Sequence, residues 1–246
     1  MTASPHADLT ASVLRPVRGH HAFEACVEQL GTAIRLGVYP RGSALPPERE
    51  LATRMSVSRA TLREAMAALR EAGLIETRRG RGGEPVVTLK PRAPARAERR
   101  TAEQREQQRD AWLDALDFRR IVEPGACALA AGAELSDASR RALTAAHDAV
   151  ANAHRAATHR QADSRFHLTL ASLTGSPRTI EAVTSVQATL HEMLSAIPVL
   201  DANIAHSDRQ HARIVRAVLA GRATDARRVM EQHCDDTAAL LRGLIG

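Results

Sequence analysis

The chain has 246 residues, of which 34 are basic and 28 acidic, so it carries a formal charge of +6. This length suits one or two domains, and a hydrophobic content of 44% is ordinary for a globular protein. The chain contains only five aromatic residues: Phe23, Tyr39, Trp112, Phe118 and Phe166. So few argue against a β-sandwich or barrel stabilised by aromatic cross-strand pairs, and against a stacking platform for single-stranded nucleic acid.

The cysteine content and the hydropathy indicate in which cellular compartment the protein is found. Cys26, Cys127 and Cys234 are too few and too scattered for a disulfide framework, and none belongs to a Cys-x-x-Cys pair. This pattern indicates a reducing compartment. No apolar run approaches the roughly 18 residues of a membrane span, and residues 1–12 lack the apolar core of a signal peptide. We therefore expect a cytoplasmic protein that does not contact a membrane.

The positive charge is unevenly distributed. Residues 1–91 carry 13 basic and 9 acidic side chains, residues 92–110 carry 6 and 4, and residues 111–246 carry 15 of each. Eight of the 11 histidines lie in the neutral last segment. A basic front and a histidine-rich back indicate two modules with different partners. Nucleic acid is the natural partner of the front module, although many basic proteins bind none.

The N-terminal part predicts a winged helix-turn-helix. Residues 1–20 are polar and predict a flexible arm, and the domain itself occupies residues 21–90. Its third helix would start after Ser58, a good N-cap residue. The apolar periodicity and the turn residues give the order helix (23–36), helix (46–55), helix (58–72), strand (74–78) and strand (86–89).

The C-terminal part predicts an all-helical domain. Residues 91–110 contain prolines and charged residues and predict a linker that becomes helical at its end. From residue 111 to residue 246 no strand is convincing. Breaks at Gly, Ser and Pro residues delimit helices near 110–131, 136–158, 161–174, 177–197, 201–220 and 222–243. The fold class is therefore mainly α: the winged helix-turn-helix with a small β-hairpin wing, followed by an antiparallel helical bundle.

The third helix would be the recognition helix, whose N-terminal residues approach base edges in the major groove. These residues are Ser58, Arg59, Thr61 and Arg63. Arginine suits paired hydrogen bonds to guanine, whereas serine and threonine suit phosphates or bases. Arg49, early in the preceding helix, is placed for another phosphate or base contact.

The loop between the two predicted strands has the composition of a DNA-binding wing. It carries Arg79, Gly80, Arg81 and Gly82, and arginines on a flexible glycine loop suit the narrow minor groove. The alternative is that the arginines of the third helix form an ordinary solvated face. The agreement between helix order, wing and charge location favours DNA binding.

Residues 21–89 closely resemble GntR-family transcriptional regulators. The resemblance is carried by LPPERELA (45–52), VSRATLREA (57–65), EAGLI (71–75) and RGRG (79–82). It implies that Arg49, Arg59, Arg63 and the wing glycines occupy the family's DNA-contacting positions. The family usually has Gly-Thr-aromatic-Val at the end of the wing, whereas this chain has Glu84-Pro85-Val86-Val87. The departure concerns the wing contacts and not the fold.

Four residues of the C-terminal part are spaced as a metal site would require. Asp163 and His167 are four residues apart and share a helix face. His211 and His233 lie at similar distances before and after Gly221, about 15 Å from it at ~1.5 Å per residue. If Gly221 turns an antiparallel helix pair, these histidines face each other. One carboxylate and three imidazoles suit a divalent transition metal with an open position. Helical histidines are more often surface or core residues, so spacing alone leaves both readings open.

Residues 111–243 resemble the FCD-type ligand-binding domain of the FadR subfamily. The resemblance is carried by RRIVE (119–123), ALA (128–130), DSRFH (163–167), HARI (211–214) and His233. It implies that Asp163, His167, His211 and His233 bind the metal ion found in metal-containing members. Zinc, nickel and manganese all remain candidates.

The resemblance also implies a role for Arg119, whose guanidinium fork can hold an effector carboxylate. The alternative is an ion pair with Glu123, four residues later on the same helix. Many members have Asn after the glycine that follows the third helix of this domain, whereas this chain has Ser176. If that Asn contributes to effector binding, the ligand of this protein differs.

These features predict a homodimeric, effector-responsive transcriptional repressor that binds a near-palindromic operator in double-stranded DNA. A small carboxylate would bind at the metal and Arg119, and the linker 91–110 would carry the change to the DNA-binding domain. The first alternative is a metal-dependent hydrolase with an appended DNA-binding module, but no general base or oxyanion hole can be assigned. The second is a nucleoid protein that binds DNA with little sequence preference.

Overall fold

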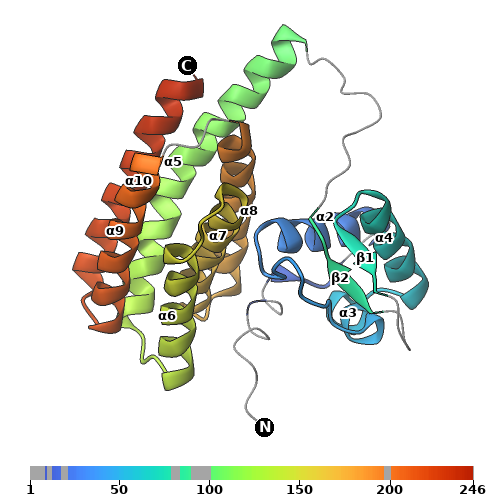
Figure 1. The fold of residues 1–246 in the computed structure, drawn as a ribbon. Helices are drawn as coiled ribbons and strands as arrows, with labels where there is room; N and C mark the ends of the chain where they lie inside the picture. Colours follow the sequence, from blue (N-terminus) through green and yellow to red (C-terminus); the bar gives the residue numbers. More distant parts are fainter. Residues whose placement is uncertain are drawn as a thin grey trace. The chain divides into compact units, whose positions relative to one another are not determined.

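The computed structural model describes residues 9, 13–17, 22–78, 84–89, 101–196 and 201–245. These residues fall into two compact units, a DNA-binding unit up to residue 89 and a helical unit from residue 101 (Figure 1). The first is a three-helix domain with a β-hairpin, and the second is entirely helical in its described residues. The predicted fold class is confirmed.

Three helices form the body of the DNA-binding unit: α2 (Ala22–Arg35), α3 (Glu48–Met55) and α4 (Arg59–Glu71). Their apolar faces meet in a core, because Leu30, Leu51, Leu62 and Leu69 are all buried. The start of α4 is fixed as predicted, since the Ser58 Oγ accepts a hydrogen bond of 3.0 Å from the backbone N–H of Thr61.

The hairpin consists of β1 (Ile75–Thr77) and β2 (Pro85–Val87), which pair antiparallel with Ile75 opposite Val87. Pro85 is tolerated because it is the first residue of its strand. The segment before α3 adds to the other side of β2, where the Leu45 N–H donates to the Pro85 carbonyl at 2.9 Å. The sequence analysis did not foresee this third extended segment.

Part of the predicted N-terminal arm packs on the DNA-binding unit. Leu14 is buried, and the Val17 N–H donates to the Met55 carbonyl at 2.8 Å. Residues 13–17 therefore contribute to the unit, whereas most of the remaining arm and residues 90–100 of the predicted linker lie outside the described residues.

The helical unit is built around α5. Its helices are α5 (Ala102–Gly132), α6 (Asp137–Ala151), α7 (Ala156–Ser172), α8 (Pro177–Ala196), α9 (Asp201–Leu219) and α10 (Ala223–Ile245). The long helix α5 packs against α7, α8, α9 and α10 (Figure 1). At the turn between α9 and α10, Gly221 has a φ of 70°, a conformation that glycine adopts without strain. None of the described helices is both long and apolar enough to cross a bilayer.

Three helix boundaries differ from the prediction by several residues: the start of α5, the end of α6 and the start of α7, which was predicted near residue 161. Helix α5 starts at Ala102, within the predicted linker, because Thr101 and Gln104 form a capping box with reciprocal bonds of 3.2 and 2.9 Å. The helix predicted over 136–158 ends at Ala151, where the Asn152 side-chain amide donates to the Asp148 carbonyl at 2.7 Å. The next helix, α7, begins at Ala156.

Two apolar clusters and a polar layer make up the interior of the helical unit. One cluster surrounds Cys127, Phe166 and Met230, and the other surrounds Leu116 and Leu241. The buried polar layer falls between them along α5. Its members are Arg119, Glu123, His167, Gln187, Gln210, His211 and His233. Buried polar groups need partners, so this layer is where a site is expected.

Candidate metal centre and nucleic-acid interface

Three histidines from three helices meet in the polar layer. His167 lies on α7, His211 on α9 and His233 on α10, and each is at most 2% exposed. Their ring centroids are 4.7 to 5.5 Å apart. One nitrogen of each ring can be chosen so that the three atoms lie within 4.8 Å of one another. The turn at Gly221 thus brings His211 and His233 face to face, as the spacing predicted.

Asp163 stands beside these rings, one helical turn before His167. Its Oδ1 lies 3.5 Å from the His211 Nε2, and the residue is 9% exposed. Among the described residues, the three predicted histidine ligands converge, whereas the fourth predicted ligand, Asp163, lies near one of them and is not part of the converging group. One carboxylate and three imidazoles are a donor set suited to a divalent transition metal.

The protonation of the rings suits coordination. Burial, followed by the nearby cationic groups including Arg119, lowers the pKa of His211 and of His233 well below the usual histidine value. Both rings are therefore neutral at pH 7, which is the form that binds metals. Both ring nitrogens of His211 and the Nε2 of His233 are buried without a hydrogen-bond partner among the described residues. A metal ion would satisfy one nitrogen of each ring, so the residues fit the metal that the family resemblance implies.

Arg119 and Glu123 form a buried ion pair beside the histidines. The Arg119 Nε donates to the Glu123 Oε2 at 3.0 Å, and both side chains are at most 2% exposed. Burial alone would raise the pKa of Glu123, but Arg119 and His167 outweigh it and hold that pKa well below its usual range. The ion pair considered as an alternative for Arg119 is therefore present.

The ion pair leaves capacity for a ligand. The Arg119 Nη1 is buried with no hydrogen-bond partner within the described chain. Gln187 on α8 donates from Nε2 to the Glu123 Oε1 at 2.5 Å, which leaves its own Oε1 without a donor there. One donor and one acceptor thus remain unused next to the histidine cluster.

Several residues of this layer were not found from the sequence. Glu123 was noted only as a possible partner of Arg119, and Gln187 and Gln210 were not noted at all. Glutamines carry no spacing signal, and only the packing of α8, α9 and α10 shows that these two are buried. Glu123 contacts a third residue that no helical spacing reveals, because its Oε2 lies 2.9 Å from the His167 Nδ1.

The neighbouring cysteine is not a metal ligand in this arrangement. The Cys234 Sγ lies 3.8 Å from the Glu123 Oε2 and is absent from the histidine group. Burial raises the pKa of the Cys234 thiol to about 12. The thiol therefore stays protonated, whereas a metal binds the thiolate.

The remaining described histidines lie outside the cluster, and two of them, His159 and His206, contact carboxylates. The His159 Nε2 lies 3.2 Å from the Asp208 Oδ1, and the His206 Nε2 lies 2.8 Å from the Asp236 Oδ2. His154 is exposed. The sequence analysis placed none of the three in the site, and none is among the histidines that converge.

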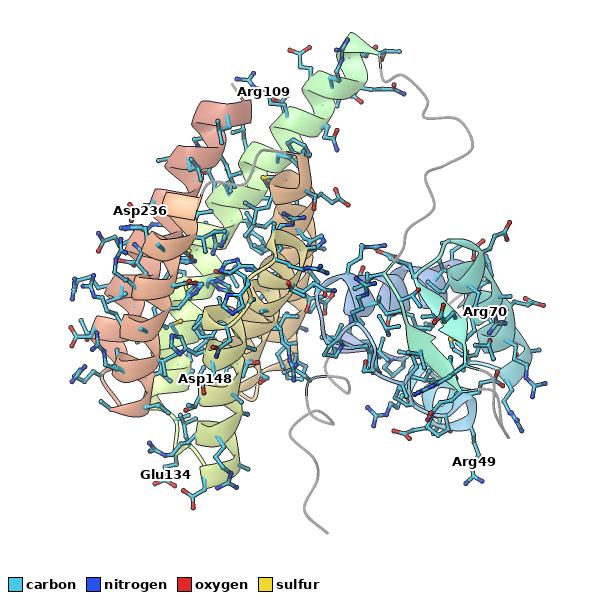
Figure 2. The ribbon with its side chains drawn as sticks, in the orientation of Figure 1. Arg49, Arg70, Arg109, Glu134, Asp148 and Asp236 are labelled. Carbon is cyan, nitrogen blue, oxygen red and sulfur yellow. The ribbon has the colours of Figure 1, made fainter. Side chains whose placement is uncertain are left out.

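In the DNA-binding unit, Arg49 and Arg59 are exposed at the N-terminal ends of α3 and α4. Figure 2 shows Arg49 extending from α3 into solvent. Arg63 is also exposed, and its Nε donates to the Glu48 Oε2 at 2.8 Å. This ion pair links α4 to α3 and leaves the outer nitrogens of Arg63 available to a nucleic acid.

The other predicted contact residues divide into two groups. Ser58 and Thr61 contact each other, with 2.8 Å between their hydroxyl oxygens, and both help to start α4. The wing residues Arg79, Gly80, Arg81 and Gly82 lie outside the described residues, so their contacts stay a prediction.

A helix-turn-helix domain with a β-hairpin, joined to a helical domain, defines a class of protein, the transcriptional regulators. Comparison with protein families agrees. Residues 23–84 match the model of bacterial regulatory proteins of the GntR family, and residues 114–236 match the FCD domain. The chain belongs to the GntR family and carries an FCD domain.

Individual relatives support this assignment. The chain is 33% identical over 222 residues to the HTH-type transcriptional regulator RmpR of Mycobacterium gastri, covering 85% of this chain and 76% of the relative. It is 39% identical over 66 residues to the transcriptional repressor NanR of Klebsiella aerogenes, about a quarter of each chain. Escherichia coli McbR/YncC shares the fold, with a TM-score of 0.50, 14% identity and coverage of 92% of this chain and 99% of that one. These comparisons give no support to the hydrolase alternative.

Glu123→Ala tests the energetic role of the buried ion pair. The substitution leaves the Arg119 guanidinium buried without its carboxylate, so we expect the free energy of unfolding to fall by about 3–5 kcal/mol. Urea unfolding followed by the fluorescence of Trp112, the single tryptophan, reports on the helical unit. Glu231→Ala, which removes a surface ion pair to Arg227, is the control and should cost about 1 kcal/mol or less. A loss at position 123 no larger than that of the control would contradict the prediction.

Proposed function

We propose that this protein is a homodimeric repressor that releases its operator when a small carboxylate binds beside a metal ion in the helical unit. One observation supports the proposal most strongly. Three buried histidines, of which His211 and His233 have ring nitrogens without a partner among the described residues, lie next to a buried arginine with an unpaired nitrogen, in a chain that carries a DNA-binding fold. Such atoms are costly to bury unsatisfied, and a metal and an anion together would satisfy them.

Arg49, Ser58, Arg59, Thr61 and Arg63 are proposed to form the surface that contacts DNA, together with Arg79, Gly80, Arg81 and Gly82 of the wing. Arg59 is exposed at the start of the recognition helix, and the nearby Glu48 and Glu50 pair with Arg63 and Arg54 instead. Its guanidinium is free to reach a base edge, which suits recognition of guanine. Repression is proposed as the direction of control, in line with the name of the relative NanR.

Asp163, His167, His211 and His233 are proposed to hold a zinc, nickel or manganese ion. A bound ion would supply a Lewis-acidic open position for a carboxylate oxygen. Arg119 would bind the same carboxylate through its Nη1, because its Nε is already engaged with Glu123. The Gln187 Oε1 is left to accept a hydrogen bond from any donor that the effector carries.

The exposed face of α5 is proposed as the dimer interface. Phe118, Ile121 and Leu129 are 43%, 73% and 60% exposed, and their spacing places them on one side of the helix. Gly125 lies on the same side, and a Cβ built there would meet nothing within 4 Å. A glycine inside a helix costs about 1 kcal/mol relative to alanine, so its presence suits close approach by a second copy.

Arg59→Ala tests the DNA-reading role. We expect the affinity for the operator to fall by about 1–3 kcal/mol and the preference at one base pair of each half-site to relax. Selection of binding sequences from a random duplex pool, followed by fluorescence anisotropy, measures both effects. Arg70→Ala changes an arginine at the far end of the same helix and should leave the selected motif intact. An unchanged motif for the variant at position 59 would refute the readout role.

His211→Ala tests the metal site. Removal of one buried imidazole should reduce the metal content of purified protein from about one ion per chain to near zero, because the ligands act as a set. Elemental analysis after metal loading measures the content. His154→Ala, at an exposed position outside the cluster, should retain the full content. Full occupancy in the variant at position 211 would disprove its assignment as a ligand.

Arg119→Lys tests the effector site while keeping a positive charge next to Glu123. A lysine cannot offer the second nitrogen of the guanidinium fork, so we expect the effector-induced release of DNA to require a far higher effector concentration. Operator binding without effector should be unaffected. A screen of small organic acids by thermal shift, with and without chelator, supplies the effector for this titration. Release at the wild-type concentration would show that Arg119 does not bind the effector.

Leu129→Glu tests the dimer interface. A carboxylate in an apolar interface would be desolvated, so we expect the protein to become monomeric and to lose affinity for a palindromic operator. Light scattering coupled to gel filtration gives the oligomeric state. Leu244→Glu makes the same change at an exposed leucine of α10 and should leave the dimer intact. A dimeric Leu129→Glu variant would place the interface elsewhere.

A further inference from the structure

We infer that Gln210, itself held by Asp236, is a positioning residue that sets the tautomer of His233 and leaves the His233 Nε2 free to bind the metal. The inference rests on the metal site proposed above. It adds two residues, one on α9 and one on α10, that neither the sequence analysis nor the donor set includes.

The orientation of the Gln210 amide follows from its neighbours. Its Nε2 donates to the Asp236 Oδ2 at 2.7 Å, and a carboxylate oxygen can only accept. The amide nitrogen must therefore face Asp236. The Gln210 Oε1 then faces the His233 Nδ1 at a distance of 3.0 Å.

The tautomer of His233 follows in turn. An amide oxygen accepts and does not donate, so the His233 Nδ1 must carry the hydrogen of this bond. The neutral imidazole, which is the form that binds a metal, has only one N–H. The His233 Nε2 is therefore the nitrogen with the lone pair, and it is also the ring atom that is buried without a partner. Ligating histidines typically donate their other N–H to such an acceptor, which fixes the ring and raises its basicity.

The two other rings are not held in the same way. The His167 Nδ1 lies next to the Glu123 carboxylate, so its orientation depends on the buried ion pair of α5. Neither nitrogen of His211 has a protein partner among the described residues. Gln210 is thus the one acceptor described for His233, and it comes from the same helix as His211.

The outer end of this arrangement lies at the protein surface. Asp236 also accepts from His206, and their side chains are 40% and 46% exposed. The order from solvent to the site is His206, Asp236, Gln210 and His233. A substitution at Asp236 therefore changes the hydrogen bond that orients Gln210, and so affects His233, without changing any residue that lines the proposed metal site.

Gln210→Met and Asp236→Ala are the test variants, and Asp236→Asn and Asp235→Ala are the controls. Methionine keeps the length of Gln210 but offers no comparable acceptor, whereas asparagine at position 236 can still accept from Gln210 through its amide oxygen. Asp235 is the next residue on α10, and its Oδ1 is bound to Arg120 and not to Gln210. Asp235→Ala removes the same charge from the same helix but leaves the hydrogen bonds between Asp236, Gln210 and His233 intact.

Zinc affinity of the full-length protein, measured by competition with a chromophoric chelator, is the first readout. We expect Gln210→Met to weaken zinc binding by about 10- to 100-fold and Asp236→Ala to weaken it less. The variants Asp236→Asn and Asp235→Ala should stay close to wild type. Wild-type affinity in both test variants would overturn the inference. Asp236 is partly exposed, so its variant keeps the test decisive if Gln210→Met fails to fold.

Nitrogen NMR of the metal-free protein, labelled at histidine, is the second readout and separates this inference from the proposed metal site. We expect the wild type to hold His233 as the Nδ1–H tautomer and Gln210→Met to give a mixture. The Nε2–H tautomer in the wild type would overturn the inference, whatever the zinc affinity. If the wild type binds no zinc, nickel or manganese but shows the Nδ1–H tautomer, the proposed metal site fails while the positioning by Gln210 stands.

Discussion

The buried ion pair between Arg119 and Glu123 is the constraint on which the rest of the helical unit depends. Two charges removed from water are tolerable only when each is satisfied by close partners. Glu123 obtains its partners from three helices: Arg119 on α5, Gln187 on α8 and His167 on α7. The packing of α5, α7 and α8 therefore determines whether the buried charges are neutralised, because all three helices supply partners to Glu123. The same packing positions the histidine cluster, because His167 contacts Glu123.

The polar layer also restricts the ligands that the proposed site could accept. Most of its hydrogen-bonding capacity is used inside the protein, and what remains is complementary to a small set of ligands. The unpaired atoms are imidazole nitrogens, one guanidinium nitrogen and one amide oxygen. A cation and an anion can satisfy them together, whereas an apolar ligand would leave them buried and unpaired. The apolar clusters around Phe166 and Leu116 close the layer along α5.

Much of this arrangement could be predicted from the sequence, because helical spacing is local. The four-residue spacing of Asp163 and His167 and the turn at Gly221 predicted which ligands share a helix face, and the family resemblance joined the two pairs into one proposed site. Gln210 and Gln187 could not be found, because their roles arise from contacts between helices distant in sequence. The early start of α5 was a different kind of omission. The capping-box residues Thr101 and Gln104 are readable in the sequence, but the charged composition that follows them favoured a linker.

The length of α5 has a mechanical consequence for regulation. A single continuous helix runs from Ala102, next to the connection with the DNA-binding unit, to the buried site at Arg119 and beyond. At about 1.5 Å per residue, the segment between these two residues is a stiff rod of about 26 Å. A tilt of about 5° at the buried end would displace the other end by about 2 Å at this length. Under the proposed function, this segment would act as a lever arm, because a rearrangement at the site too small to break its hydrogen bonds would displace the far end of the helix by a larger distance.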